Sequence, residues 1–143
     1  MIAAVWDTPY NLVYVVHMLS VIVGTGMAVL APVMAVRARR EAGRPVQEFV
    51  DDVAAAVVFP SFLVAGMAGG ALVGLSDDFY DFGQTWLAIG GVVWIIAVAA
   101  AALAYPPSYV PVPDMVQHRS MLTGVLHLSL AVMLILMTWK WGV

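Results

Sequence analysis

The fold is decided first by residues 11–36, which read NLVYVVHMLSVIVGTGMAVLAPVMAV and contain no Asp, Glu, Lys or Arg. Residues 53–76, 82–113 and 120–139 share this property. A helix needs roughly 20 apolar residues to cross a hydrocarbon core about 30 Å thick, and each stretch is long enough. Prolines from Pro106 onward end the third helix near Tyr105. The sequence therefore predicts four transmembrane helices, at about residues 10–36, 52–76, 83–105 and 119–141.

The composition of the 143-residue chain agrees with this prediction, because 63% of the residues are hydrophobic and only 10% are charged. A soluble domain carries about 25% charged residues. The few basic residues do not form the patch that a nucleic-acid-binding protein needs, so we expect no nucleic-acid partner. The absence of cysteine excludes a disulfide scaffold, a thiolate metal site and covalent attachment of c-type haem. No loop is long enough for a soluble domain, and residues 1–143 are expected to form one transmembrane domain.

The charges between the spans predict the orientation. Four arginines, at positions 37, 39, 40 and 44, separate the first two spans, and positive residues mark cytoplasmic loops. The loop of residues 77–81 carries only acidic charges, so we expect it and both termini outside. Tryptophans 6, 86, 139 and 141 then fall at the outer interface. Together these features predict an all-α, up-and-down four-helix bundle in a bacterial inner membrane, with the lipid bilayer as its surroundings.

Small residues predict the faces on which the helices pack. His17, Ser20, Gly24 and Ala28 share one side of the first helix, and Leu19, Ile22, Val29, Leu30 and Val33 occupy the opposite side, which should meet lipid. Three glycines repeat at helical spacing in the second helix, namely Gly66, Gly70 and Gly74. They could allow close helix packing within the bundle, in a homodimer or in a larger membrane complex.

Backbone signals add two local expectations. Asp51 and Asp52 stand where the second helix is expected to begin, and their carboxylates could cap its free amide groups. Pro32 and Pro60 lie inside spans, where they should bend the helices and free backbone carbonyl groups.

Two histidines, His17 and His127, lie deep inside the first and last spans. An ionisable group in hydrocarbon is costly, and its default interpretation is a functional site. If Trp6 and Trp139 lie at the same outer level, His17 comes about 16 Å below the first and His127 about 18 Å below the second. The two imidazoles are then expected to face each other near the middle of the membrane.

Facing imidazoles at one depth suit the axial ligation of haem b, with a role in electron transfer or haem-linked redox chemistry. We expect His17 and His127 to ligate the iron, and Ser20 and Thr123 to orient their rings. Gly24 and Gly124, on the same faces, would help to leave room for the flat macrocycle. Trp94 could pack against its edge.

Two alternatives stay open. Each histidine could instead be hydrogen-bonded between helices, in a non-catalytic accessory or scaffold subunit of a larger membrane complex. The chain also contains nine methionines, which allow copper handling, because thioether sulfur suits Cu(I). The sequence holds no HExxH, GxSxG or Walker motif, and no residue is predicted to be catalytic.

Residues 14–26, which read YVVHMLSVIVGTG and lead into the arginine-rich loop, resemble the opening helix of small four-span bacterial membrane proteins related to the CopD copper-resistance domain. Residues 136–140, which read LMTWK, are similar to the last helix of that group. More distantly, the chain resembles the haem-associated HemJ-type protoporphyrinogen oxidases in its size, span count and early histidine. It departs from them after Gly26, where their aromatic- and arginine-rich stretch is missing. The resemblance therefore implies a functional role for His17 alone, and it does not imply oxidase activity.

Overall fold

The computed structural model describes residues 7–41, 44–77, 79–106 and 118–139. These residues form four α-helices and no strand; the helices are α1 (Thr8–Glu41), α2 (Arg44–Gly74), α3 (Thr85–Ala104) and α4 (Arg119–Trp139). All four helices are long and apolar enough to cross a membrane. The predicted all-α, four-span fold is confirmed, and the chain is built as a multi-pass membrane protein. The proline-rich connector after Pro106, Trp6 and Trp141 lie outside the described residues.

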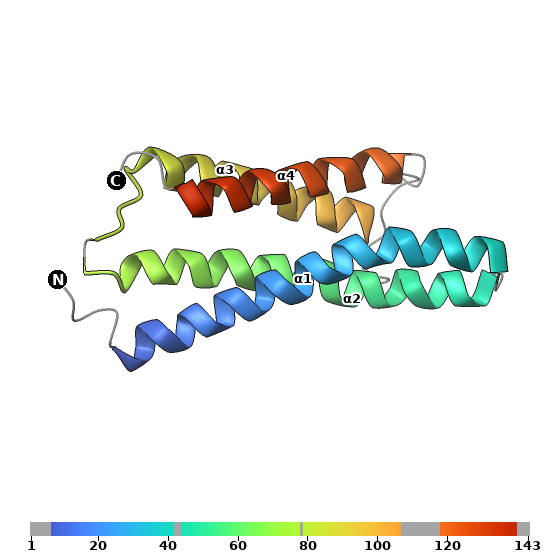
Figure 1. The fold of residues 1–143 in the computed structure, drawn as a ribbon, viewed down its shortest axis with the longest axis horizontal. Helices are drawn as coiled ribbons and strands as arrows, with labels where there is room; N and C mark the ends of the chain where they lie inside the picture. Colours follow the sequence, from blue (N-terminus) through green and yellow to red (C-terminus); the bar gives the residue numbers. More distant parts are fainter. Residues whose placement is uncertain (1–6, 42–43, 78, 107–117, 140–143) are drawn as a thin grey trace.

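The helices run alternately up and down and form two hairpins (Figure 1). Helix α1 packs along α2, and α3 packs along α4, whereas the α2–α3 and α1–α4 contacts between the hairpins are smaller. We call one end of the bundle the arginine end, because α1 ends there after Arg37 and Arg40, and α4 begins there at Arg119. The other end is the aspartate end, where Asp77 and Asp81 lie in the connection from α2 to α3.

The first hairpin extends past the second at the arginine end (Figure 1). Helix α2 begins at Arg44, so Asp51 and Asp52 lie within the helix and the prediction that they cap it is wrong. The residues before them continue the helix because this part of the hairpin is packed: Ala38 of α1 is 4% exposed and Val50 of α2 is 2% exposed. Hydropathy marks only the part of a helix that meets hydrocarbon, and this helix starts earlier.

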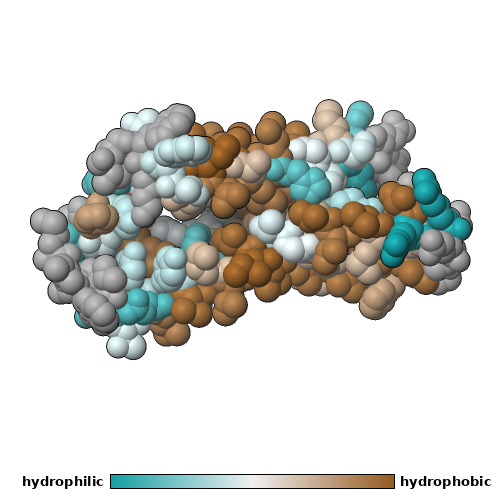
Figure 2. All heavy atoms as spheres, viewed as in Figure 1, coloured by the Kyte–Doolittle hydropathy of each residue, from teal (hydrophilic) through white to brown (hydrophobic). Residues whose placement is uncertain are grey.

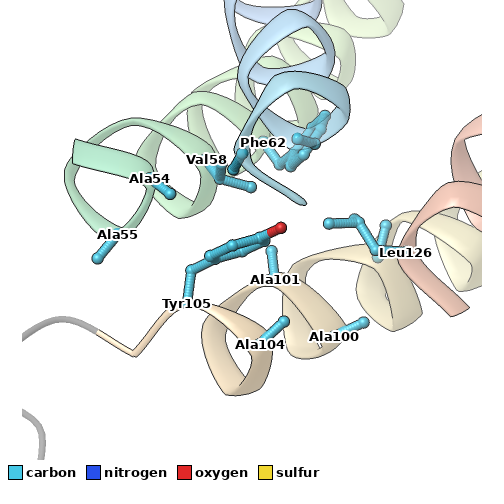
Figure 3. Packing of buried hydrophobic residues seen from close by; sticks show 12 residues of the cluster. Ala54, Ala55, Val58, Phe62, Ala100, Ala101, Ala104, Tyr105 and Leu126 are labelled. Carbon is cyan, nitrogen blue, oxygen red and sulfur yellow. The ribbon is translucent and has the colours of Figure 1, made fainter. Parts of the chain in front are cut away.

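The core of the bundle is made mainly of alanines. Its buried residues come from all four helices, and they are Ala28, Ala31, Ala54, Ala55, Val58, Phe62, Ala97, Ala100, Ala101, Ala104, Tyr105 and Leu126. Figure 3 shows Tyr105 lying between Val58 of α2 and Leu126 of α4. In a membrane, helices associate through van der Waals packing, and small residues let their backbones approach closely. This explains why a core of small side chains holds these helices.

The outer surface carries an apolar belt between more polar ends (Figure 2). On α1 the side chains predicted to meet lipid are all exposed, by 50% to 60%. His17 and Ser20, on the opposite side of α1, are half-buried, while Gly24 and Ala28 are buried. The prediction of which side of α1 faces inward is therefore confirmed.

The alanine core predicts a sharp position dependence on α3. We expect Ala101→Leu to lower the free energy of unfolding by about 1–3 kcal/mol, because Ala101 is fully buried and a larger side chain would force the helices apart. Ala99→Leu, two residues away at a less buried position, is the matched control and should have little effect. Unfolding in detergent micelles, followed by circular dichroism, measures both variants. Equal effects at the two positions would contradict the packing described here.

Candidate functional site

His17 joins α1 to α2. Its Nδ1 atom lies 2.7 Å from the carbonyl oxygen of Ala65. A carbonyl oxygen only accepts hydrogen bonds, so Nδ1 must carry the proton in this pair. The ring fits because Gly69 has no side chain: a Cβ atom at that position would lie 3.3 Å from Cε1 of His17. His17 therefore donates a hydrogen bond to a neighbouring helix within its own hairpin.

His127 joins α4 to α1 through the other type of ring nitrogen. Its Nε2 atom lies 3.0 Å from the carbonyl oxygen of Ala28. In a regular helix this carbonyl would accept from the residue four positions later, which here is Pro32, and proline has no N–H to donate. His127 supplies the donor that Pro32 lacks. The sequence predicted that Pro32 frees a carbonyl, but it did not predict that His127 would bind it.

Trp94 makes a third bond of this kind, from α3 to α2. Its Nε1 atom donates to the carbonyl oxygen of Phe62 at 2.8 Å. The indole ring occupies the place where Gly66 has no side chain, since a Cβ atom there would lie 1.9 Å from Cε2 of Trp94. Of the three regularly spaced glycines in α2, Gly66 thus allows close packing within the bundle, against Trp94 of α3. Cβ atoms built at Gly70 and Gly74 would meet nothing within 4 Å.

The two imidazoles bind at different levels of the bundle. Ala28, which binds His127, lies eleven residues after His17 on α1, and this corresponds to about 16 Å of helix rise. Metal–imidazole bonds are about 2 Å long, so two nitrogens on opposite sides of one metal ion are about 4 Å apart. One side chain is too short to close this separation. A single haem iron between His17 and His127 therefore does not fit this arrangement.

The stagger of α4 against α1 explains the difference from the sequence prediction. The His127–Ala28 bond fixes this stagger, and Trp139, twelve residues after His127, comes level with about Val16 of the antiparallel helix α1. The prediction had placed Trp139 level with Trp6, ten residues earlier on α1. Two interfacial residues do not define the relative depth of two helices to better than a few turns.

The other predicted cofactor-binding residues are not gathered around one space. A Cβ atom at Gly24 would lie 2.9 Å from Cβ of Ser61, so Gly24 packs against α2. Ser20 is half-buried on α1, and Gly124 is exposed on α4. Thr123 donates from Oγ1 to the carbonyl oxygen of Arg119 at 2.8 Å, inside its own helix. Gly24 therefore serves helix packing, and Thr123 makes a local bond.

A polar cluster that was not predicted from the sequence lies at the arginine end. Arg119 of α4 donates from Nη1 and Nη2 to the two carboxylate oxygens of Asp51 on α2, at 2.9 and 2.6 Å. Its guanidinium also lies 5.1 Å from the ring centre of Tyr105, within range of a cation–π interaction. Burial raises the pKa of the Tyr105 hydroxyl, while Thr123 and Arg119 beside it act in the opposite direction.

This cluster could have been found by pairing charges across the predicted helices. Asp51 and Arg119 carry opposite charges, and both lie at the arginine end in any up-and-down arrangement of the four spans. From the sequence alone, Asp51 was expected to cap the start of the second helix. A two-point Arg–carboxylate pair is among the stronger polar contacts in proteins, and here it ties the two hairpins together.

The connection at the aspartate end is ordered by Ser76. Its Oγ atom donates to the carbonyl oxygen of Val73 at 2.7 Å and accepts from the backbone N–H of Tyr80 at 3.0 Å. The Tyr80 ring packs edge-on against Trp86, with the ring centres 5.7 Å apart. Trp86 is 5% exposed, so it anchors the connection to the start of α3.

The fold and these contacts define a class: a four-span helical membrane protein whose helices are tied by side chains that donate to backbone carbonyls of their neighbours. No protein-family model, curated protein or solved structure matches the chain. The resemblance to CopD-related proteins remains a prediction from the residues of the first and last helices.

The bond between His127 and the carbonyl freed by Pro32 predicts coupling between these residues. His127→Ala should lower the free energy of unfolding by about 1–3 kcal/mol, because it leaves a carbonyl in hydrocarbon without a donor. In a Pro32→Ala background, the substituted residue regains a backbone N–H that can donate to the carbonyl of Ala28, and the same change should cost less than half as much. A double-mutant cycle measured by unfolding in micelles tests this. Additive effects would contradict the assignment.

The Asp51–Arg119 pair predicts that neighbouring aspartates differ in importance. Asp51→Asn should lower the free energy of unfolding by about 1–2 kcal/mol, because Arg119 would lose an ionic partner in a half-buried site. Asp52→Asn, at the exposed neighbouring position, is the matched control and should change stability by less than about 0.5 kcal/mol. Thermal unfolding in detergent compares the two, and a larger loss at Asp52 would refute the pairing.

Proposed function

We propose that this chain is a non-catalytic helical subunit of a larger assembly in a bacterial inner membrane, with His17 and His127 as structural hydrogen-bond donors. The observation that carries this proposal is that each imidazole donates to a backbone carbonyl of a neighbouring helix. A partnered imidazole in hydrocarbon needs no cofactor to explain it, since interhelical hydrogen bonds are a common use of histidine in membranes.

The surface supports the subunit role. In the most apolar window of each span, only 17% to 28% of the residues are buried within the bundle. The remaining surface is available to lipid and to other membrane helices. Gly70 and Gly74 of α2 have open space around them, and such glycines allow a second helix to approach closely. A partner that supplies this helix could be another copy of the chain or a different membrane protein.

A haem or copper ion held by His17 is the second candidate function, and one observation favours it. Because Nδ1 of His17 donates to a carbonyl, the neutral ring keeps a lone pair on Nε2. Histidines that ligate metals in proteins usually have their other nitrogen bonded in this way. This candidate uses one histidine as ligand and requires no contact between His17 and His127.

Absorption spectroscopy and metal analysis of the protein, purified in mild detergent from a bacterial membrane, separate these functions. We expect no Soret band and no stoichiometric copper, and a complex larger than one chain by native mass spectrometry. His17→Asn keeps a donor near the Nδ1 position and should preserve the complex, whereas His17→Ala should weaken it. A Soret band that His17→Ala abolishes would establish the haem candidate, and stoichiometric copper without haem would establish copper handling.

A further inference from the structure

The first hairpin has an apolar hollow between its two helices, near the aspartate end. Helix α1 crosses α2 at an angle, and the two helices separate toward this end (Figure 1). Leu12 and Met67 are 64% and 65% exposed, whereas Ala68 is 8% exposed, so the hollow opens outward from a buried floor. Its volume is about 360 Å³, and the residues that line it are Leu12, Val13, Val16, Val64, Met67, Ala68 and Ala71.

The packing of the hairpin keeps this hollow open. His17 follows Val16, and its hydrogen-bond partner Ala65 follows Val64, so the bond between α1 and α2 lies directly beside the hollow. The bond holds the helices at this level, and the two alanines on the α2 wall are too small to fill the space beyond it. Walls that face an empty space lose van der Waals contacts, so an occupant that fills the hollow is favoured.

The size and chemistry of the hollow select a hydrocarbon chain. All the side chains that line it are hydrocarbon or thioether, and they offer no hydrogen-bond donor. From Val64 to Ala71 the hollow follows about 10 Å of helix rise, against about 15 Å for the hydrocarbon of one leaflet. One turn of a helix with its side chains fills roughly 400 Å³, which is more than the hollow holds. A single acyl chain fits this space better than a helix does.

The helix ends above the hollow indicate the headgroup. Leu12 lies four residues after the start of α1, and Ala71 lies three residues before the end of α2, so the hollow begins about 5 Å below these ends. Of the residues that the structure describes, the charged ones beside these two ends are Asp7 and Asp77, and both are exposed. Carboxylates attract an ammonium group and repel a headgroup with a net negative charge.

We propose that this hollow binds one acyl chain of a phospholipid with an ammonium headgroup, of the phosphatidylethanolamine class, in the leaflet on the aspartate side. The acyl chain fills the wedge between α1 and α2, and the ammonium group lies beside Asp7 and Asp77. The site belongs to the first hairpin alone, so the proposal is independent of the subunit role proposed above.

Lipid titrations followed by native mass spectrometry test the site. The probes, added to the delipidated protein in mild detergent, are phosphatidylethanolamine and phosphatidylglycerol with the same acyl chains. We expect one phosphatidylethanolamine to bind about threefold more tightly than phosphatidylglycerol. Val16→Phe fills the hollow from α1 and should weaken this binding about tenfold, because methylene groups of the lipid lose their buried position. Val15→Phe, at an exposed neighbouring position outside the hollow, is the matched control and should bind as the unchanged protein does.

A second pair of variants tests the α2 wall and remains informative if Val16→Phe fails to fold. Ala71→Phe fills the hollow from α2 and should weaken binding by a similar factor. Ala88→Phe on α3 is its control, since both alanines are exposed and lie three residues from the aspartate-side end of their helices. Retained binding in both Val16→Phe and Ala71→Phe, or equal losses in the control variants, would overturn the site. A dimer that the same two variants disrupt, without bound lipid, would also overturn it and place a second copy of the chain in the hollow.

The headgroup assignment has its own test. Asp7→Asn combined with Asp77→Asn should make the affinities for the two lipids nearly equal, because the attraction for the ammonium group is lost. Asp52→Asn, at an exposed position toward the arginine end, is the control and should keep the preference. Equal affinities for the two lipids in the unchanged protein would overturn the assignment to phosphatidylethanolamine.

Discussion

The structure depends on one constraint: a backbone carbonyl in hydrocarbon needs a hydrogen-bond donor, and water is not there to supply it. Pro32 breaks this condition at Ala28, in the middle of a long helix. The donor comes from another helix, through Nε2 of His127. A break in one helix thereby determines where a second helix binds and at what depth. Together with the packing of α4 along α3 and the Asp51–Arg119 pair, this bond fixes the position of α4 in the bundle.

Side chains also bind backbone carbonyls that already accept a hydrogen bond within their own helix, and glycines make these carbonyls accessible. Trp94 and His17 each bind a carbonyl of α2 located four residues before a glycine, namely Gly66 and Gly69. A side chain at either glycine would collide with the ring or press against it. Since Cβ atoms in a helix tilt toward its N-terminus, a glycine uncovers the carbonyl of the preceding turn. Polar aromatic side chains can therefore enter an apolar bundle without unpaired N–H groups.

The span pattern was predictable from the sequence because hydropathy over some 20 residues is a strong and local signal. The inward side of α1, with His17 and Gly24, followed from helical spacing. The partners of the histidines did not follow, because they depend on the stagger between helices, which no local signal records. Asp51 shows the same limit: its partner, Arg119, lies 68 residues away on another helix. The position of a residue along its own helix can be estimated from that helix alone, whereas its contacts depend on how a second helix is placed against the first.

The two ends of the bundle are stabilised by different means. At the arginine end, an alanine core and the Asp51–Arg119 pair hold helices from both hairpins. At the aspartate end, the covalent connection between α2 and α3 holds the hairpins together, while α1 contacts mainly α2. Packed small residues make many weak van der Waals contacts at once, so the arginine half of the bundle resists separation as a unit. The contact between α1 and α4 is the smallest of those between neighbouring helices, and the buried residues that the two helices contribute to the core are Ala28, Ala31 and Leu126.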